Sequence, residues 1–307
     1  MSTRDGFGDA ILALGQKNKN VVVVSADLAE STRVDKFGQK FPERFFEVGV
    51  AEQNMAGIAA GLALAGKIPF IASFGVFSPG RNWDQIRVSI AYSQANVKII
   101  ASHTGLSVGE DGASHQALED IAIMRSLPNI IVLAPADYYQ TKKATLEAAK
   151  IKGPVYIRFA RQASPLLTNE KSPFQIGKAQ IMCPGQDLTI IGCGPILAEA
   201  LIAVDKLKEK NIKVELINCH TIKPLDKNTI LKSVRKTGRL ITIEDHQKAG
   251  GLGSAIAEML AENYPLPMEL IGVNDTFGES GKPKELWDKY GLSSSYIVNA
   301  ALKILKK

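Results

Sequence analysis

The stretch Phe46-Glu-Val-Gly-Val-Ala-Glu-Gln-Asn-Met55 decides the fold, because it leads from a strand almost directly into a helix. A short apolar strand ends near Gly49, and residues 51–66 are mostly Ala, Gly and aliphatic side chains. Such small residues let backbones approach closely, so we expect a helix buried on nearly all sides. Glu52 would stand in its first turn, at the carboxyl end of a strand, where open α/β sheets bind ligands. The position alone leaves two roles open, a catalytic carboxylate or a complement to the helix dipole.

Strand and helix patterns alternate on both sides of this stretch. Residues 21–24 form a continuous β-branched run, which is typical of a parallel strand buried on both faces. Further strand patterns cover 45–48, 68–74, 97–103, 130–133 and 155–159. Helical patterns cover 3–16, 51–65, 82–95, a segment ending near 125, and 138–150. The alternation predicts an α/β fold with a doubly wound, mostly parallel sheet over residues 1–165.

A second, smaller α/β domain is predicted after a linker. Proline and glycine punctuate residues 166–187, which contain no long apolar run, as in a linker. Alternation resumes over 188–307. The predicted strands are 188–194, 214–218, 240–244 and 269–273, and the predicted helices are 196–210, 227–236, 254–263 and 295–306.

The composition argues against several classes of function. The net charge of +6 reflects 37 basic and 31 acidic residues, and the basic ones are spread out, so no nucleic-acid groove is expected. Cys183, Cys193 and Cys219 have neither metal-ligand spacing nor a disulfide framework. No signal region or stretch of membrane-spanning length is visible. We therefore expect a cytoplasmic protein that binds neither nucleic acid nor membrane.

A long polar loop follows the fourth predicted strand. Residues 104–115 contain three glycines and no periodicity, and loops of this length inside a compact domain are usually functional or disordered. Glu110, Asp111 and His115 lie in the loop, and His103 stands at its entrance. One such histidine would most simply form a surface hydrogen bond. Two histidines together with Asp111 favour a polar substrate pocket.

Other candidate residues stay ambiguous on pattern alone. Phe74 and Phe77 lie at and just beyond a strand end, where aromatic residues belong to the core more often than to a cofactor platform. Guanidinium groups pair well with phosphate. Four arginines are candidates for that role, and spacing selects none of them: Arg4, Arg33, Arg81 and Arg161.

Five motifs occur in this order: Ser25-Ala-Asp-Leu, Val48-Gly-Val-Ala-Glu-Gln-Asn-Met55, Gly109-Glu-Asp-Gly-Ala-Ser-His115, Arg125-Ser-Leu-Pro-Asn129 and Phe159-Ala-Arg-Gln162. Together they resemble the C-terminal half of a transketolase. The likeness covers nearly the whole chain and is most specific over residues 1–165. It implies a subunit that binds the pyrimidine end of thiamine diphosphate. The implied reaction transfers a two-carbon ketol unit from a ketose phosphate to an aldose phosphate.

The resemblance also implies roles for individual residues. Glu52 matches the glutamate that hydrogen-bonds N1′ of the aminopyrimidine, while Asp111 and His115 match residues that contact the donor near its reacting carbons. The implied lining of the cofactor pocket is Asp27, Phe74 and Phe77, of which Phe77 is the stacked ring. The implied phosphate-binding set is Arg4, Ser31, His103 and Arg161. One departure is Gly80, where the family has a further aromatic residue.

The chain lacks a motif that the family uses to hold the diphosphate and its metal. No Gly-Asp-Gly occurs in the 307 residues, so no metal site is assigned to this chain. A separate N-terminal subunit is therefore expected to carry that motif together with Mg²⁺ or Ca²⁺, and the pocket would form between chains. The expected symmetric assembly is an α2β2 heterotetramer.

Three alternatives stay open. A deoxyxylulose-phosphate synthase is similar, although that family usually carries both halves in one chain. The β-subunit of a 2-oxo acid dehydrogenase decarboxylase is a second rival, and residues 109–115 and the sugar-phosphate set argue against it. The third alternative, a non-catalytic structural partner, would need none of Glu52, Asp111 and His115.

Overall fold

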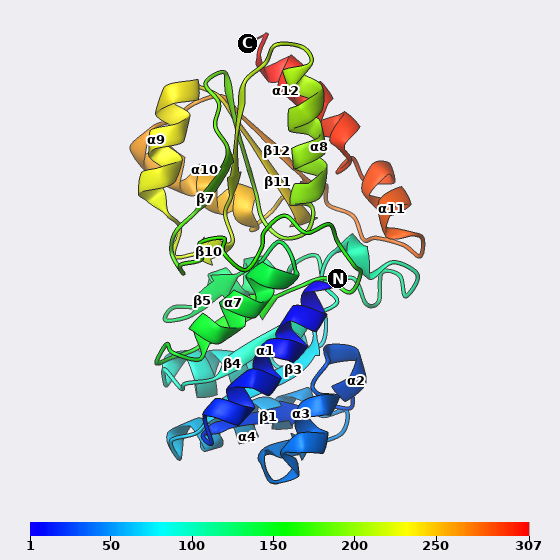
Figure 1. Cartoon of the computed structure of the whole chain (residues 1–307), viewed down its shortest axis with the longest axis vertical. Coiled ribbons are helices and arrows are strands. Elements are labelled where there is room, and N and C mark those ends of the chain that lie inside the picture. The colour runs from blue at the N-terminus through cyan, green and yellow to red at the C-terminus, as the bar shows by residue number, and fades with distance from the viewer. Residues whose placement is uncertain (307) are drawn as a thin grey trace.

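The computed structural model describes residues 1–306, which build two α/β units that lie one above the other (Figure 1). The larger sheet, in the lower half of the figure, has the strand order β10-β5-β6-β4-β3-β1-β2. Its neighbouring strands are parallel, except that β10 is antiparallel to β5. The strands are β1 (Val21–Ser25), β2 (Phe45–Glu47), β3 (Ile68–Phe74), β4 (Lys98–Ser102), β5 (Ile131–Leu133), β6 (Val155–Arg158) and β10 (Thr221–Lys223).

Helices cover both faces of this sheet. Successive strand residues point to opposite faces, and accordingly Val23 packs with Phe7 in one buried cluster while Val24 packs with Met55 in another. The first face carries α1 (Thr3–Lys17), α3 (Asp35–Lys40) and α7 (Tyr138–Ala148). The second carries α4 (Glu52–Leu64), the π-helical η2 (Ile86–Tyr92) and α6 (Asp120–Arg125). The predicted doubly wound fold is therefore confirmed.

The smaller sheet has the strand order β12-β11-β8-β9-β7, with only β7 antiparallel. Helices α9 and α10 lie on one side of it and α8 and α12 on the other (Figure 1). Its strands are β7 (Gln180–Cys183), β8 (Leu188–Gly192), β9 (Val214–Asn218), β11 (Leu240–Gln247) and β12 (Met268–Val273). Its helices are α8 (Leu197–Lys208), α9 (Lys227–Thr237), α10 (Leu252–Asn263), α11 (Pro283–Lys289) and α12 (Ser294–Ile304). None of the described helices is both long and apolar enough to cross a bilayer.

Several short elements differ from the sequence patterns. The helix predicted over 82–95 is one turn, α5 (Trp83–Gln85), followed by η2. The helix that ends near 125 begins only at Asp120, and a 3₁₀ turn, η3 (Leu106–Val108), lies in the loop before it. Four further helical elements were not predicted, because each is too short to show a helical period: α2 (Ala29–Thr32), α3, η1 (Pro42–Arg44) and α11.

Two strands connect segments that the patterns keep apart. β7 lies within 166–187, the predicted linker, and forms an antiparallel edge of the smaller sheet. β10 follows β9 along the chain but pairs with β5 of the larger sheet, where Thr221 lies opposite Leu133. A strand of three residues carries no readable alternation, and its partner is remote in sequence. The chain after the linker therefore contributes a strand to the larger sheet.

Candidate functional site

The predicted site residues gather at one edge of the larger sheet. Asp27, Glu52, Phe77 and His103 follow the ends of β1, β2, β3 and β4 respectively. Parallel strands direct their carboxyl ends to the same edge, and ligands of open α/β sheets bind there. The fold thus brings four separate stretches of sequence to one edge.

Glu52 is the first residue of α4 and its side chain is almost fully buried. Its carboxylate accepts a hydrogen bond from Arg81 Nη1 at 3.0 Å, and Asn82 Nδ2 donates to its backbone carbonyl at 3.1 Å. The same residues border a cavity of about 740 Å³, which is lined by Val50, Ala51, Glu52, Gln53, Asn54 and Arg81. A buried carboxylate at the wall of a cavity is suited to proton exchange with a bound ring.

A group of aromatic rings is linked to this carboxylate through Arg81. Phe74 stacks on His103 with ring centroids 3.8 Å apart, and Phe77 lies 5.8 Å from Phe74. The His115 ring meets Phe77 edge-on at 5.4 Å. The guanidinium of Arg81 lies over the Phe77 ring, 4.2 Å from its centroid. Arg81 therefore contacts both Glu52 and Phe77, although the sequence patterns did not select it.

Gly80 explains the missing aromatic residue of this pocket. A Cβ atom at this position would lie 2.0 Å from the backbone oxygen of Val76. The turn after Phe77 therefore has no room for a side chain at position 80. The next residue, Arg81, supplies the side chain that covers Phe77.

His103 is buried in a left-handed backbone conformation with φ of 57°. Burial, helped by the neighbouring charges of Arg4 and Arg161, lowers its pKa to about 3. Its Nδ1 lies 2.8 Å from Ser102 Oγ. The ring is therefore neutral at physiological pH and acts through hydrogen bonds rather than charge.

Three arginines surround this histidine. Arg4 stands in the first turn of α1 and its Nη1 donates to the backbone oxygen of Ser31 at 3.1 Å. Burial and the nearby charges of Arg33 and Arg161 lower the pKa of Arg4, and only Asp5 acts in the opposite direction. Arg4 Nε is buried without a hydrogen-bond partner in residues 1–306. An anion bound here would relieve both the repulsion and the unsatisfied donor.

The loop after β4 carries Asp111 and His115 close to the arginines. Arg161 Nη1 donates to the backbone oxygen of Val108 at 3.0 Å and lies 3.6 Å from both Glu110 and Asp111. The base of the loop is closed by a hydrogen bond from the Gly105 amide to the Ala117 oxygen. The tip of the loop is exposed at Glu110, Asp111 and Ser114.

Asp27 and Ser31 make the fewest side-chain contacts with the other predicted site residues. Asp27 is exposed with φ of 59°, and its amide donates to Glu47 Oε1 at 2.7 Å. Within residues 1–306 no hydrogen bond joins its carboxyl group to another predicted site residue. Ser31 meets Arg4 through its backbone only. Arg33 belongs to the arginine group but was left unselected, because nothing in its local pattern distinguishes it from a solvated arginine.

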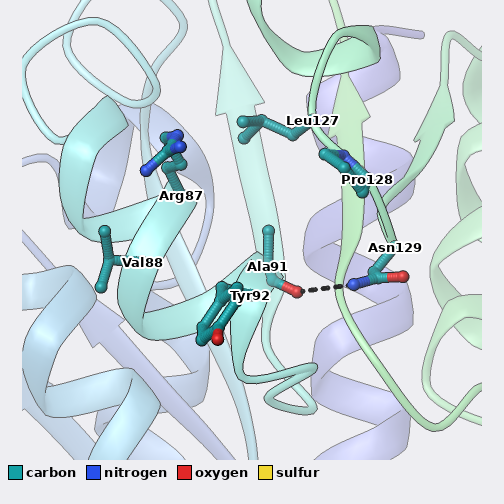
Figure 2. A pocket seen from close by; sticks show the side chains of 7 residues that line it. All are labelled: Arg87, Val88, Ala91, Tyr92, Leu127, Pro128 and Asn129. Atoms are coloured by element: carbon teal, nitrogen blue, oxygen red, sulfur yellow. Dashed lines mark hydrogen bonds between the residues drawn. The ribbon is translucent and has the colours of Figure 1, made fainter.

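A second cavity lies away from this edge. It has a volume of about 320 Å³, lies between η2 and the segment after α6, and contains none of the predicted residues (Figure 2). Its lining is Arg87, Val88, Ala91, Tyr92, Leu127, Pro128 and Asn129. It lacks nucleophilic and acidic side chains. In residues 1–306 there is also no cluster of His, Cys, Asp and Glu that could hold a metal ion.

Comparison with known proteins identifies relatives over the whole length. The family descriptions that match are "Transketolase, pyrimidine binding domain" over residues 1–165 and "Transketolase, C-terminal domain" over residues 177–297. A putative transketolase C-terminal section of Methanocaldococcus jannaschii is 49% identical over 307 residues, covering 99% of this chain and 96% of the relative. A 6-deoxy-6-sulfo-D-fructose transketolase subunit of Clostridium sp. (strain MSTE9) is 41% identical over 304 residues, covering 99% and 94%. Human transketolase is 37% identical over 311 residues, and the match covers all of this chain but 49% of the human protein.

Two solved structures that resemble this chain are also transketolases. A split gene transketolase, described as an inactive beta4 tetramer, superposes with a TM-score of 0.93 at 45% identity and covers 100% of this chain and 99% of that one. Transketolase from Campylobacter jejuni superposes with a TM-score of 0.85 over 99% of this chain and 46% of that chain. Its identity is 23%, so this second likeness shows the fold alone.

Proposed function

This chain belongs to the transketolase family of thiamine diphosphate-dependent transferases, and we propose that it is the C-terminal subunit of a split transketolase. The proposed reaction moves a two-carbon ketol unit from a ketose phosphate to an aldose phosphate. The observation that carries the proposal is the buried Glu52 carboxylate at the wall of a cavity, which is linked to the Phe77 ring through a contact that both make with Arg81.

The residues fit the aminopyrimidine of thiamine diphosphate. A flat ring on Phe77, with a ring nitrogen toward Glu52, would make the two contacts that Arg81 makes now. When bound, the cofactor supplies the nucleophilic carbon and the electron sink for carbon–carbon cleavage. Glu52 would hold and return a proton at that nitrogen, and Phe77 would orient the ring. Asp27 would line the outer side of the pocket.

The remaining residues suit an anionic sugar. Arg4 and Arg161, with His103 and Ser31 beside them, would bind the phosphate at the far end of the substrate. Asp111 and His115 would contact hydroxyl groups near the reacting carbons and so orient the donor. Relatives named for sulfofructose and for apulose 4-phosphate suggest that sulfonates and phosphates should both be tried as substrates.

A partner chain completes the proposed enzyme. The chain spans about half of human transketolase but nearly all of the split-type relatives, which supports a second subunit with the diphosphate and metal site. We propose that this subunit holds Mg²⁺ or Ca²⁺ and that two copies of each chain form a heterotetramer in the cytoplasm. The inactive β4 tetramer of a split transketolase supports the need for the partner.

Reconstitution tests this proposal. We expect the purified chain with thiamine diphosphate and Mg²⁺ to be inactive, and to gain transketolase activity when the N-terminal subunit is added. In the reconstituted enzyme, Glu52→Ala should slow deuterium exchange at the cofactor C2 by about 100-fold or more, because the proton-transferring group is lost. Robust turnover by the isolated chain, or an unchanged exchange rate in Glu52→Ala, would overturn the proposal.

A further inference from the structure

A residue of the smaller sheet forms hydrogen bonds with the loop that carries Asp111 and His115. Asp245 lies near the carboxyl end of β11, and its carboxylate is buried. Oδ1 accepts a hydrogen bond from the Leu106 amide at 2.8 Å, and Oδ2 accepts one from the Ser107 amide at 3.2 Å. These amides begin η3, and the first amides of a helix lack partners within it. Asp245 therefore caps η3 across 139 residues of sequence.

The residues around the Asp245 carboxylate pack tightly against it. Gly105 precedes η3 with φ of 80°, and a Cβ atom there would lie 2.4 Å from Asp245 Oδ2. Trp287 of α11 donates its Nε1–H to the same oxygen at 3.0 Å. The far end of the loop is held as well, because Gln116 Nε2 donates to the backbone oxygen of Glu279 at 3.0 Å.

The cap reaches the substrate residues through η3. Arg161 donates to Val108, the last residue of η3, and lies beside Asp111. We infer that Asp245 is a positioning residue, which places η3 and thereby sets Arg161 and the Asp111 loop for the sugar phosphate. Its catalytic part rests on the proposed function, whereas the placement of the loop does not.

Asp245→Asn removes the part of the cap that Oδ2 makes, with little change of shape. An amide in place of Oδ2 would turn a donor toward the Ser107 amide and Trp287 Nε1. The end of β11 keeps other ties, since Arg158 Nη2 donates to the Asp245 backbone oxygen and the Gln247 amide donates to Leu118. Trp287→Phe is a milder variant that removes one donor. Glu215→Gln is the matched control, because Glu215 is a buried acid of the same sheet that pairs with Lys236 and not with the loop.

Hydrogen exchange of the isolated chain is the first measurement. We expect amides of residues 104–109 to exchange about tenfold faster or more in Asp245→Asn, less so in Trp287→Phe, and at the wild-type rate in Glu215→Gln. Unchanged protection of 104–109 in Asp245→Asn, or an equal loss in Glu215→Gln, would overturn the inference. This result stands even if the chain has no transketolase partner.

Kinetics of the reconstituted enzyme is the second measurement. For the donor sugar phosphate, kcat/KM should fall by about 100-fold in Asp245→Asn, mainly through KM, because misplaced binding groups carry such costs. Deuterium exchange at the cofactor C2 should be unchanged, since the Asp245 carboxylate binds Leu106, Ser107 and Trp287 and does not contact Glu52, which Asn82 holds through its backbone oxygen. Equal losses in C2 exchange and in kcat/KM would refute a positioning role. An inactive wild-type pair would instead refute the proposed function.

Discussion

At the scale of single residues, Arg81 makes both contacts that the cofactor's pyrimidine would need. Its guanidinium pairs with Glu52 at 3.0 Å and covers the Phe77 ring at 4.2 Å. The Arg81 side chain is half exposed, so it can turn into solvent, whereas Glu52 stays buried. An exposed pair would contribute up to about 1 kcal/mol, and burial of one partner screens this pair less. Arg81 thus competes with the ring that Glu52 and Phe77 are proposed to bind.

Arg81→Met should strengthen binding of thiamine to the isolated chain. Loss of the competing pair should lower the dissociation constant by about fivefold or more, which isothermal titration calorimetry can measure. Arg87→Met is the matched control, because Arg87 lines the separate cavity of Figure 2 and does not contact Glu52. An unchanged or weaker affinity for thiamine in Arg81→Met would contradict competition.

At the scale of elements, two glycines in helices have opposite reasons to be there. A Cβ atom at Gly6 of α1 would lie 2.3 Å from the backbone oxygen of Tyr138, so the missing side chain lets α1 and α7 cross closely. At Gly57 of α4 no heavy atom lies within 4 Å of such a Cβ, and the residue is exposed. Packing therefore requires a glycine at position 6, whereas the glycine at position 57 only makes the helix less stable than alanine would.

The same substitution should therefore change stability in opposite directions. Gly6→Ala should lower the free energy of unfolding by about 2 kcal/mol through overpacking. Gly57→Ala should raise it by about 0.5 to 1 kcal/mol, since alanine favours the helix. Urea unfolding of the isolated chain at one protein concentration can compare the two. Changes of the same sign would show that the α1–α7 crossing is not as tight as described.

At the scale of the whole molecule, buried histidines make stability depend on pH. Burial lowers the pKa of His220 from 6.5 to about 4, and the values for His103 and His246 are about 3 and 4. Between these values and 6.5 the unfolded chain binds protons that the folded chain does not. The contribution of these histidines to the free energy of unfolding is thus fully present above pH 6.5. Below pH 6.5 the free energy of unfolding falls, by up to about 1.4 kcal/mol per pH unit for each histidine.

His220→Gln tests this dependence at one site. Between pH 6.5 and 5.0 the variant should lose less free energy of unfolding than the wild type, as measured by urea denaturation. Glu244 acts in the opposite direction, because burial raises its pKa to about 7, so the comparison between variant and wild type is more informative than either curve alone. Parallel curves for the two proteins would contradict the assigned shift of the His220 pKa.

Much of this molecule follows from local patterns of sequence. The β-branched run 21–24 and the alternation around it predict a buried parallel sheet, because residues on both faces of its strands must be apolar. The sequence also places the first turn of the helix after Glu52 at the carboxyl edge, but α4 is buried along one side only, so the expected burial on nearly all sides is not found. The family match confirms the fold and the transketolase resemblance, while the roles of Asp111, His115 and the phosphate set stay predictions.

The sequence by itself therefore determined most of the longer strands and helices, and the edge of the sheet at which the candidate site is expected. Only the tertiary structure decided that Arg81 pairs with Glu52, that β10 joins the larger sheet and that Asp245 caps η3. Periodicity reports which face of a segment is buried, and nothing in it identifies a partner that lies 139 residues away. Such partners are chosen by packing and register once the whole chain has folded.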